Sequence, residues 1–155
     1  MTTYKPERQR VMSNIKKIVI TPHTPAQMYA LVSDFANYPH YLPWCPSSQI
    51  LSQNGNIIVG RVDIEYLKVK AHFTTSNVNT LNERIDMTLV DGPFKELTGH
   101  WIFTPLGETG CKIEFNLDYK FSNFLIEKVI GTVFEIVIKN IVDAFVKKAN
   151  EIYRK

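Results

Sequence analysis

Alternation of apolar and polar residues along the chain predicts a series of β-strands. The clearest case is residues 111–121, where every second side chain is apolar and the residues between are charged or carry amides. A period of two is typical of a strand with one buried face and one solvated face. Related patterns predict the other strands at residues 14–21, 49–53, 56–66, 69–79, 84–90 and 94–104.

Short turn signals separate most of these strands. Asn54-Gly55 is typical of a two-residue β-hairpin turn, and Asp91-Gly92-Pro93 marks a second turn. Consecutive strands joined by short turns pair antiparallel, so the order predicts a meander of about seven strands. No internal repeat or linker interrupts it, which indicates a single domain over residues 14–155.

A short helix is expected after the first strand. Thr24 can cap it, Pro25 suits its first position, and Gln27 can complete a capping box. We expect this helix to reach about Phe35. The segment 37–46 then holds three prolines among aromatic residues, which predicts a compact loop or a short helical turn.

The last segment, residues 123–154, returns to the helical period of 3.6 residues. We expect one helix of roughly 45 Å with Ser122 as its cap. Its apolar side is unusually wide, and its narrow polar stripe alternates in charge, which indicates a solvated face. Gly131 within it suggests a kink or a close approach.

These elements predict an α+β fold in which a curved antiparallel sheet wraps a long C-terminal helix. A sheet with one apolar face must cover that face, and only this helix is long enough. A curved sheet contacts a helix best at its middle, which leaves room toward the ends for a ligand. Pattern alone does not distinguish such a cavity from an ordinary filled core.

Charge and cysteine content add little to the predicted fold, but they bear on the chain's start, its location and its thiols. The net charge is +3, and positive residues gather near the start, where residues 1–13 are expected to form a basic, flexible extension. The apolar stretches lack the length of a membrane span, and no signal-peptide pattern is found, so a cytoplasmic protein is expected. Cys45 and Cys111 are far apart in sequence and are expected to be reduced thiols.

Catalytic and metal-binding motifs are missing from the sequence. The four histidines have no metal-ligand spacing, and no nucleophile, phosphate-binding or dinucleotide motif occurs. Tyr66 or Tyr119 in a pocket could serve as a general acid, but no nucleophile and base pair accompanies either. We therefore expect no enzyme, no catalytic residue, no metal and no redox cofactor.

The aromatic loop allows two interpretations. Tyr38, Tyr41, Leu42 and Trp44 could dip into a lipid headgroup layer at a cavity mouth, because Trp and Tyr favour that region. Alternatively, Tyr38 and Trp44 pack beneath the first helix and anchor the loop.

Four strings resemble the coenzyme Q-binding protein family: YPHYLPWC (38–45), VDGPFKELTGHWIFTPL (90–106), CKIEFNLDYKF (111–121) and VDAFVKKA (142–149). That family is grouped with polyketide cyclase and START-like lipid-transfer domains, and its bacterial members include the ribosome association toxin. The similarity covers residues 14–153. It implies a helix-grip fold with a deep hydrophobic cavity and brings no catalytic residues.

Two functions follow as expectations from this resemblance. The first is a carrier of ubiquinone or a related isoprenoid lipid, which would touch the inner membrane surface transiently. The second is a ribosome-associated toxin that binds the large ribosomal subunit through basic residues, expected at Lys5, Arg8, Lys16, Lys17, Lys147, Lys148 and Arg154. For the carrier, the expected mouth residues are Tyr38, Trp44 and Phe94. The expected lining residues are Phe73, Met87, Leu89, Trp101, Phe103, Phe115, Val133 and Val137.

Overall fold

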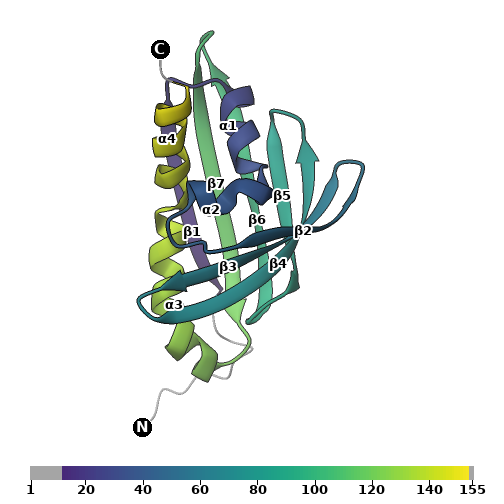
Figure 1. Ribbon diagram of the computed structural model, residues 1–155, viewed down its shortest axis with the longest axis vertical. Coiled ribbons are helices and arrows are strands. Elements are labelled where there is room, and N and C mark those ends of the chain that lie inside the picture. The colour runs from purple at the N-terminus through teal and green to yellow at the C-terminus, as the bar shows by residue number, and fades with distance from the viewer. Residues whose placement is uncertain (1–11, 154–155) are drawn as a thin grey trace.

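Seven antiparallel strands form one strongly curved sheet in the computed structural model, which describes residues 12–153 (Figure 1). The order across the sheet is β1-β7-β6-β5-β4-β3-β2, so consecutive strands pair and only β1 joins the last strand instead. The strands are β1 (Ser13–Thr21), β2 (Ser48–Asn54), β3 (Ile57–Tyr66), β4 (Val69–Thr80), β5 (Arg84–Asp91), β6 (Phe94–Leu106) and β7 (Gly110–Phe121). The predicted meander of seven strands is confirmed.

The alternation in β7 explains which face of the sheet is inward. From Cys111 to Phe121 every second residue is buried, and the residues between are half-buried. Strand β1 pairs with β7 over its whole length, from Ser13 opposite Tyr119 to Thr21 opposite Cys111. The concave face is therefore continuous and apolar across the centre of the sheet.

The first helix begins as the sequence predicts. In α1 (Pro25–Val32) the Thr24 hydroxyl accepts a hydrogen bond from the Gln27 backbone N–H at 3.1 Å. The Gln27 side chain accepts one from the Thr24 N–H at 2.9 Å, which completes the capping box. The helix ends at Val32, three residues earlier than expected. A single turn η2 (Phe35–Asn37) and a short helix α2 (Tyr38–Tyr41) follow.

The expected single C-terminal helix is wrong, because the chain breaks at Asn140 into α3 (Phe124–Lys139) and α4 (Ile141–Ile152). The Asn140 side-chain nitrogen donates to the Ile136 carbonyl at 2.7 Å, the acceptor that its own backbone N–H would use in a continuous helix. Its backbone N–H bonds instead to the Val137 carbonyl. An asparagine side chain can compete with the backbone for its hydrogen-bond partners in this way.

Two smaller expectations about this helix are also corrected. Asn123 rather than Ser122 caps α3, because the Asn123 side-chain oxygen accepts from the Ile126 N–H at 2.9 Å. Gly131 marks neither the break nor a tight contact. A Cβ added there would meet only Glu127 and Phe121, at ordinary distances of 3.5 and 3.6 Å.

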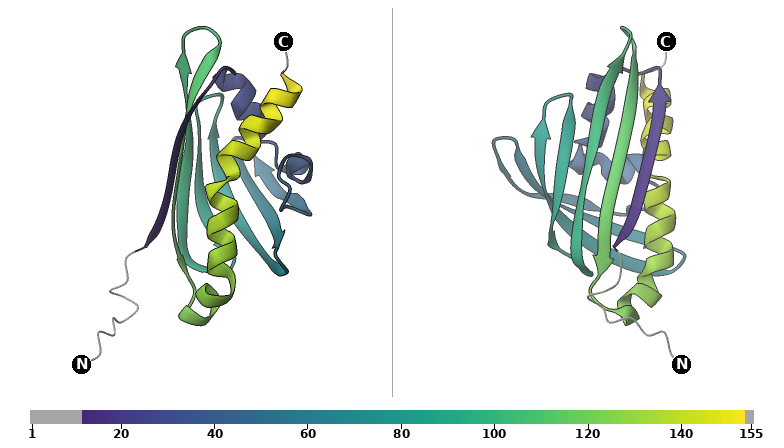
Figure 2. Two further views of the ribbon diagram at one scale, coloured as in Figure 1. Left: turned by 90° about the vertical axis from the view of Figure 1, so that its left-hand side faces the viewer. Right: turned by 180° about the vertical axis from the view of Figure 1, so that it is seen from behind.

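Helices α3 and α4 lie along the concave face of the sheet, and the shorter α1 and α2 lie beside α4 on the same side (Figure 2). Phe134 of α3 is fully buried among aromatic rings of the sheet. Its ring centroid lies 4.9 Å from that of Tyr119 and 5.0 Å from that of Phe94. Phe145 of α4 is buried in the same way against Trp101, at 5.7 Å.

Most of the basic extension expected at residues 1–13 lies outside the described residues, and Ser13 already belongs to β1. Among residues 12–153, no helix is both long enough and apolar enough to cross a membrane.

The contact between α3 and the sheet predicts the cost of removing one ring. Phe134→Ala should lower the free energy of unfolding by about 3–5 kcal/mol, because it leaves a cavity among Phe94, Tyr119 and their neighbours. Urea unfolding followed by circular dichroism measures this. Leu125→Ala is the matched control on the same helix: its side chain is 70% exposed, so a change within about 0.5 kcal/mol is expected. Equal losses in the two variants would contradict this account of the core.

Candidate ligand-binding site

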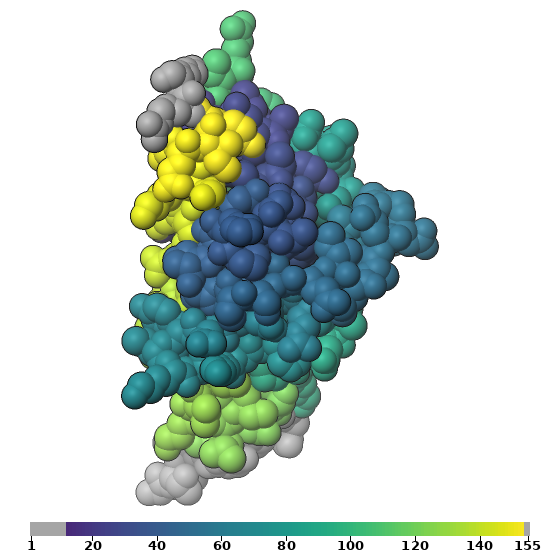
Figure 3. All heavy atoms as spheres, viewed as in Figure 1, coloured from purple at the N-terminus to yellow at the C-terminus, as the bar shows by residue number. Residues whose placement is uncertain are grey.

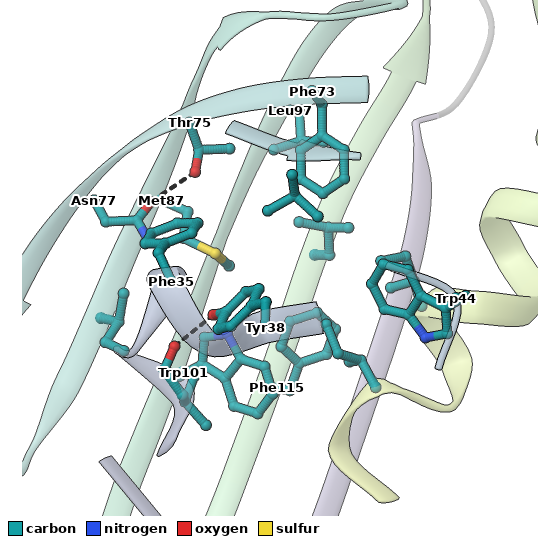
Figure 4. A pocket seen from close by; sticks show the side chains of 16 residues that line it. Phe35, Tyr38, Trp44, Phe73, Thr75, Asn77, Met87, Leu97, Trp101 and Phe115 are labelled. Atoms are coloured by element: carbon teal, nitrogen blue, oxygen red, sulfur yellow. Dashed lines mark hydrogen bonds between the residues drawn. The ribbon is translucent and has the colours of Figure 1, made fainter. Parts of the chain in front are cut away.

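An apolar cavity lies between the concave face of the sheet, the α1-to-β2 segment and the junction of α3 and α4 (Figure 4). Ile138 and Ile141, on either side of the helix break, line it from the helical layer. Its remaining lining residues come from the first helical segment and from strands β3 to β7: Val32, Phe35, Tyr38, Trp44, Val62, Phe73, Thr75, Asn77, Ile85, Met87, Leu97, Trp101, Phe115 and Leu117.

Two glycines let aromatic and sulfur-containing side chains reach this position. A Cβ on Gly60 would lie 2.8 Å from the Phe35 ring, so the ring can rest on β3 only because residue 60 has no side chain. A Cβ on Gly99 would lie 2.6 Å from the Asn116 carbonyl oxygen and 3.0 Å from the Met87 methyl group. Gly99 thus preserves both the close approach of β7 and the position of Met87 in the lining.

The cavity is much smaller than expected, with a volume of about 50 Å³. That volume holds a few water molecules, whereas a cavity on the order of 150 Å³ is needed to take one benzene ring. The aromatic side chains fill most of the interior in which the family resemblance implied a deep cavity. A ligand of that size therefore enters only if some of these side chains move.

The structure brings together six of the eleven predicted site residues: Tyr38, Trp44, Phe73, Met87, Trp101 and Phe115. The other five do not line the cavity. Phe94 stacks on Phe121 at 5.0 Å, and Phe103 lies edge-on to Tyr29 of α1 at 6.1 Å. Val133 and Val137 are buried in the packed core, and Leu89 packs against its edge.

The sequence interpretation missed the helical and polar parts of the lining. Thr75 and Asn77 have the same parity as Phe73 along β4, so alternation places them on the inward face. Their polar side chains argued against an inward position, although both are buried. Ile138 and Ile141 are three residues apart and share the apolar side of the predicted helix, but the sequence interpretation chose Val133 and Val137, nearer its start, as lining.

The burial of Tyr38, Leu42 and Trp44 favours the second interpretation of the aromatic loop, in which these side chains anchor it beneath the first helix. Leu42 and Trp44 are 1% and 5% exposed, and Tyr38 donates a hydrogen bond to the Val32 carbonyl beneath α1. Tyr41 donates to Asp34 at 2.9 Å. The atoms between α1 and β2 cover the middle of the face shown in Figure 3, where they close the cavity from outside.

Few side chains at this site can ionise. Tyr38 is the one side chain in the described lining that can ionise near neutral or alkaline pH, and burial raises its pKa. Its hydroxyl group donates a hydrogen bond to the Val32 carbonyl. Within residues 12–153, no cluster of three His, Cys, Asp or Glu side chains could hold a metal ion.

The comparisons with known proteins agree with this geometry. The family model described as polyketide cyclase/dehydrase and lipid transport matches residues 21–146. The chain belongs to this family. One relative, the ribosome association toxin RatA of Escherichia coli K12, is 44% identical to this chain over 143 residues, which cover 92% of this chain and 90% of the toxin. A coenzyme Q-binding protein, COQ10 homolog B of Xenopus laevis, is 28% identical over 132 residues, covering 82% and 54%.

Solved structures of other proteins have the same fold. The Zhui aromatase/cyclase from Streptomyces sp. R1128 superposes with a TM-score of 0.82 at 13% identity, over 92% of this chain and 96% of that one. A START superfamily protein from Mycobacterium smegmatis gives 0.73 at 20% identity, over 89% and 97%. The predicted START-like, helix-grip fold is therefore confirmed, and likeness at these identities concerns the fold alone.

Two buried thiols predict how stability depends on pH: Cys45 in the aromatic loop and Cys111 beside the β6–β7 turn. Burial raises the pKa of Cys45 and of Cys111 to about 11, from an ordinary value of 9.0. As pH rises from 9 the unfolded chain loses these protons first, so ionisation favours unfolding. The urea midpoint, measured with a reductant present, should be constant from pH 7 to 8 and fall between pH 9 and 11.

A Cys45→Ala, Cys111→Ala double variant is the control for this effect. Its decline between pH 9 and 10 should be shallower, because tyrosines ionise mainly above that range. An identical slope in the parent and the double variant would show that the thiols do not contribute.

Proposed function

We propose that this chain is a non-catalytic binding protein for a hydrophobic small molecule of the quinone or isoprenoid class. The observation that carries this proposal is the apolar, aromatic cavity at the junction of α3 and α4. Such a lining with a few polar groups is typical of small-molecule sites. Membership of a family described by lipid transport, and a relative named for coenzyme Q binding, support the same ligand class.

A ligand would enlarge the cavity by moving side chains of its lining. Met87 has three rotatable side-chain bonds and a polarisable sulfur, so it adapts readily to a new neighbour. It is only half-buried, and it lies beside Phe35 in the view of Figure 4. Displacing these two side chains extends the cavity without disturbing the aromatic cluster around Phe134.

The lining supports binding rather than chemistry. Among the described residues, it holds no carboxylate, histidine, lysine, arginine, serine or cysteine. The Tyr38 hydroxyl is the nearest to a general acid, but burial raises its pKa and its proton is donated to a backbone carbonyl. General acid–base catalysis needs a group whose pKa lies near the working pH, which Tyr38 does not provide.

Filling the cavity should abolish ligand retention. Met87→Trp places a bulky ring in the space, so the organic extract of the freshly purified variant should contain no more quinone than an unrelated soluble protein. The parent protein should retain quinone in near-stoichiometric amount by mass spectrometry. Thr88→Trp is the matched control, because Thr88 is the next residue of β5 and faces solvent. Loss from both variants, or from neither, would contradict this site.

A second candidate is association with the large ribosomal subunit, which the 44% identity to a ribosome association toxin favours. Of the basic residues expected to contact RNA, Lys5, Arg8 and Arg154 lie outside the described residues. Lys17 and Lys148 already pair with carboxylates, at 3.3 Å to Asp143 and 3.4 Å to Glu151. Lys16 of β1 and Lys147 of α4 are exposed, on the two elements whose seam Lys17 and Asp143 join.

Ribosome association predicts a strong dependence on salt. Cosedimentation with purified large subunits should weaken steeply between 50 and 200 mM salt, because phosphate contacts release counterions. The Lys16→Glu, Lys147→Glu double variant should weaken binding and lower the slope of log affinity against log salt by about one for each lysine. Lys70→Glu is the control: this exposed lysine lies on β4 beside the β3–β4 turn, 4.0 Å from Glu65. Salt-insensitive binding, or an equal effect of the control, would reject this seam.

A further inference from the structure

Two polar side chains interrupt the otherwise apolar lining of the cavity. Thr75 and Asn77 on β4 are 3% and 5% exposed, and both line the space beside Met87 (Figure 4). The Thr75 hydroxyl donates a hydrogen bond to the Asn77 side-chain oxygen at 2.8 Å. Buried polar groups in an apolar pocket are costly to place there, and in ligand sites they fix the orientation of the bound molecule.

The hydrogen bond determines which atoms remain for a ligand. The Asn77 oxygen is occupied by Thr75, which leaves the amide nitrogen, a donor of two hydrogen bonds, on the side toward Phe35 and Met87 (Figure 4). The Trp44 side chain also lines the cavity. Its indole N–H is buried and has no hydrogen-bond partner among the described residues. The proton of the Tyr38 hydroxyl, by contrast, is used by the Val32 carbonyl.

The charge of the lining restricts the ligand further. No charged side chain from the described residues faces the cavity. A carboxylate ligand would therefore lose its water without gaining a cationic partner, which is strongly unfavourable. A pure hydrocarbon would avoid that cost but would leave the Asn77 donor unpaired.

From these observations we propose that the cavity selects a neutral apolar molecule carrying a carbonyl-type hydrogen-bond acceptor, which the Asn77 amide nitrogen binds. The inference rests on the proposed ligand-binding function and narrows its ligand class. Thr75 is a positioning residue, since its hydroxyl holds the amide so that the nitrogen faces the ligand. A hydrogen bond of this kind changes affinity by about three- to tenfold.

Three probes of equal chain length test this proposal: 2-undecanone, undecane and undecanoate at pH 8. Binding is measured by the change in tryptophan fluorescence, because both tryptophans of the chain, Trp44 and Trp101, line the cavity. The ketone should bind about three- to tenfold more tightly than the alkane. The carboxylate should bind more weakly than either.

Variants separate the hydrogen bond from the shape of the cavity. Asn77→Leu keeps the volume and removes the donor, so the ketone and the alkane should bind equally and the alkane should bind at least as well as in the parent. Thr75→Val should reduce the preference for the ketone without removing alkane binding. Ser76→Ala, the intervening residue on the opposite face of β4, should leave the preference unchanged.

The outcomes distinguish this inference from the function on which it rests. If ketone and alkane bind the parent equally, or if Asn77→Leu retains the preference, the role of Asn77 is rejected while the apolar site stands. If undecanoate binds best, the neutral ligand class is wrong. If none of the probes binds, the cavity holds only water, and both the inference and the proposed ligand-binding function fail.

Discussion

The contact between the C-terminal helices and the concave face of the sheet is the interaction on which the rest of the structure depends. An antiparallel sheet can leave one face in water, but its apolar face must be covered, and only α3 and α4 are long enough to do so. Phe134 and Phe145 provide the two centres of this contact, one on each helix. Each lies among aromatic rings of the sheet or of the first helical segment, with Phe145 5.4 Å from Tyr38.

The position of the cavity follows from having two centres rather than one. Asn140 interrupts the helix between Phe134 and Phe145, and each half packs on the curved sheet through its own buried residues. The space not filled by either half lies at their junction, where Ile138 and Ile141 face it. The break at Asn140 therefore lies beside the space in which a ligand can be accommodated.

The sequence predicted the sheet well because its signal is local. Alternation in β7 and the capping box of Thr24 and Gln27 each depend on residues within a few positions, and the structure confirms both. The helix break depended on one hydrogen bond of Asn140, and asparagine lowers helix stability without specifying a break. The lining needed knowledge of packing: Trp101 and Phe103 share one face of β6, yet only Trp101 reaches the cavity.

Volume and energy together indicate what kind of molecule could bind. Moving Phe35 and Met87 off their preferred rotamers costs roughly 1–3 kcal/mol in all, whereas burying about 200 Å² of apolar ligand surface contributes about 5 kcal/mol. A single ring can therefore offset the cost of opening the cavity, but the roughly 2–4 kcal/mol that remains does not exceed the loss of about 4–15 kcal/mol in rigid-body freedom. Tight binding requires a ligand whose apolar surface continues beyond the ring, and the half-buried side chains between α3 and β4, Val69 and Ile130 among them, offer the apolar contacts that such a continuation needs.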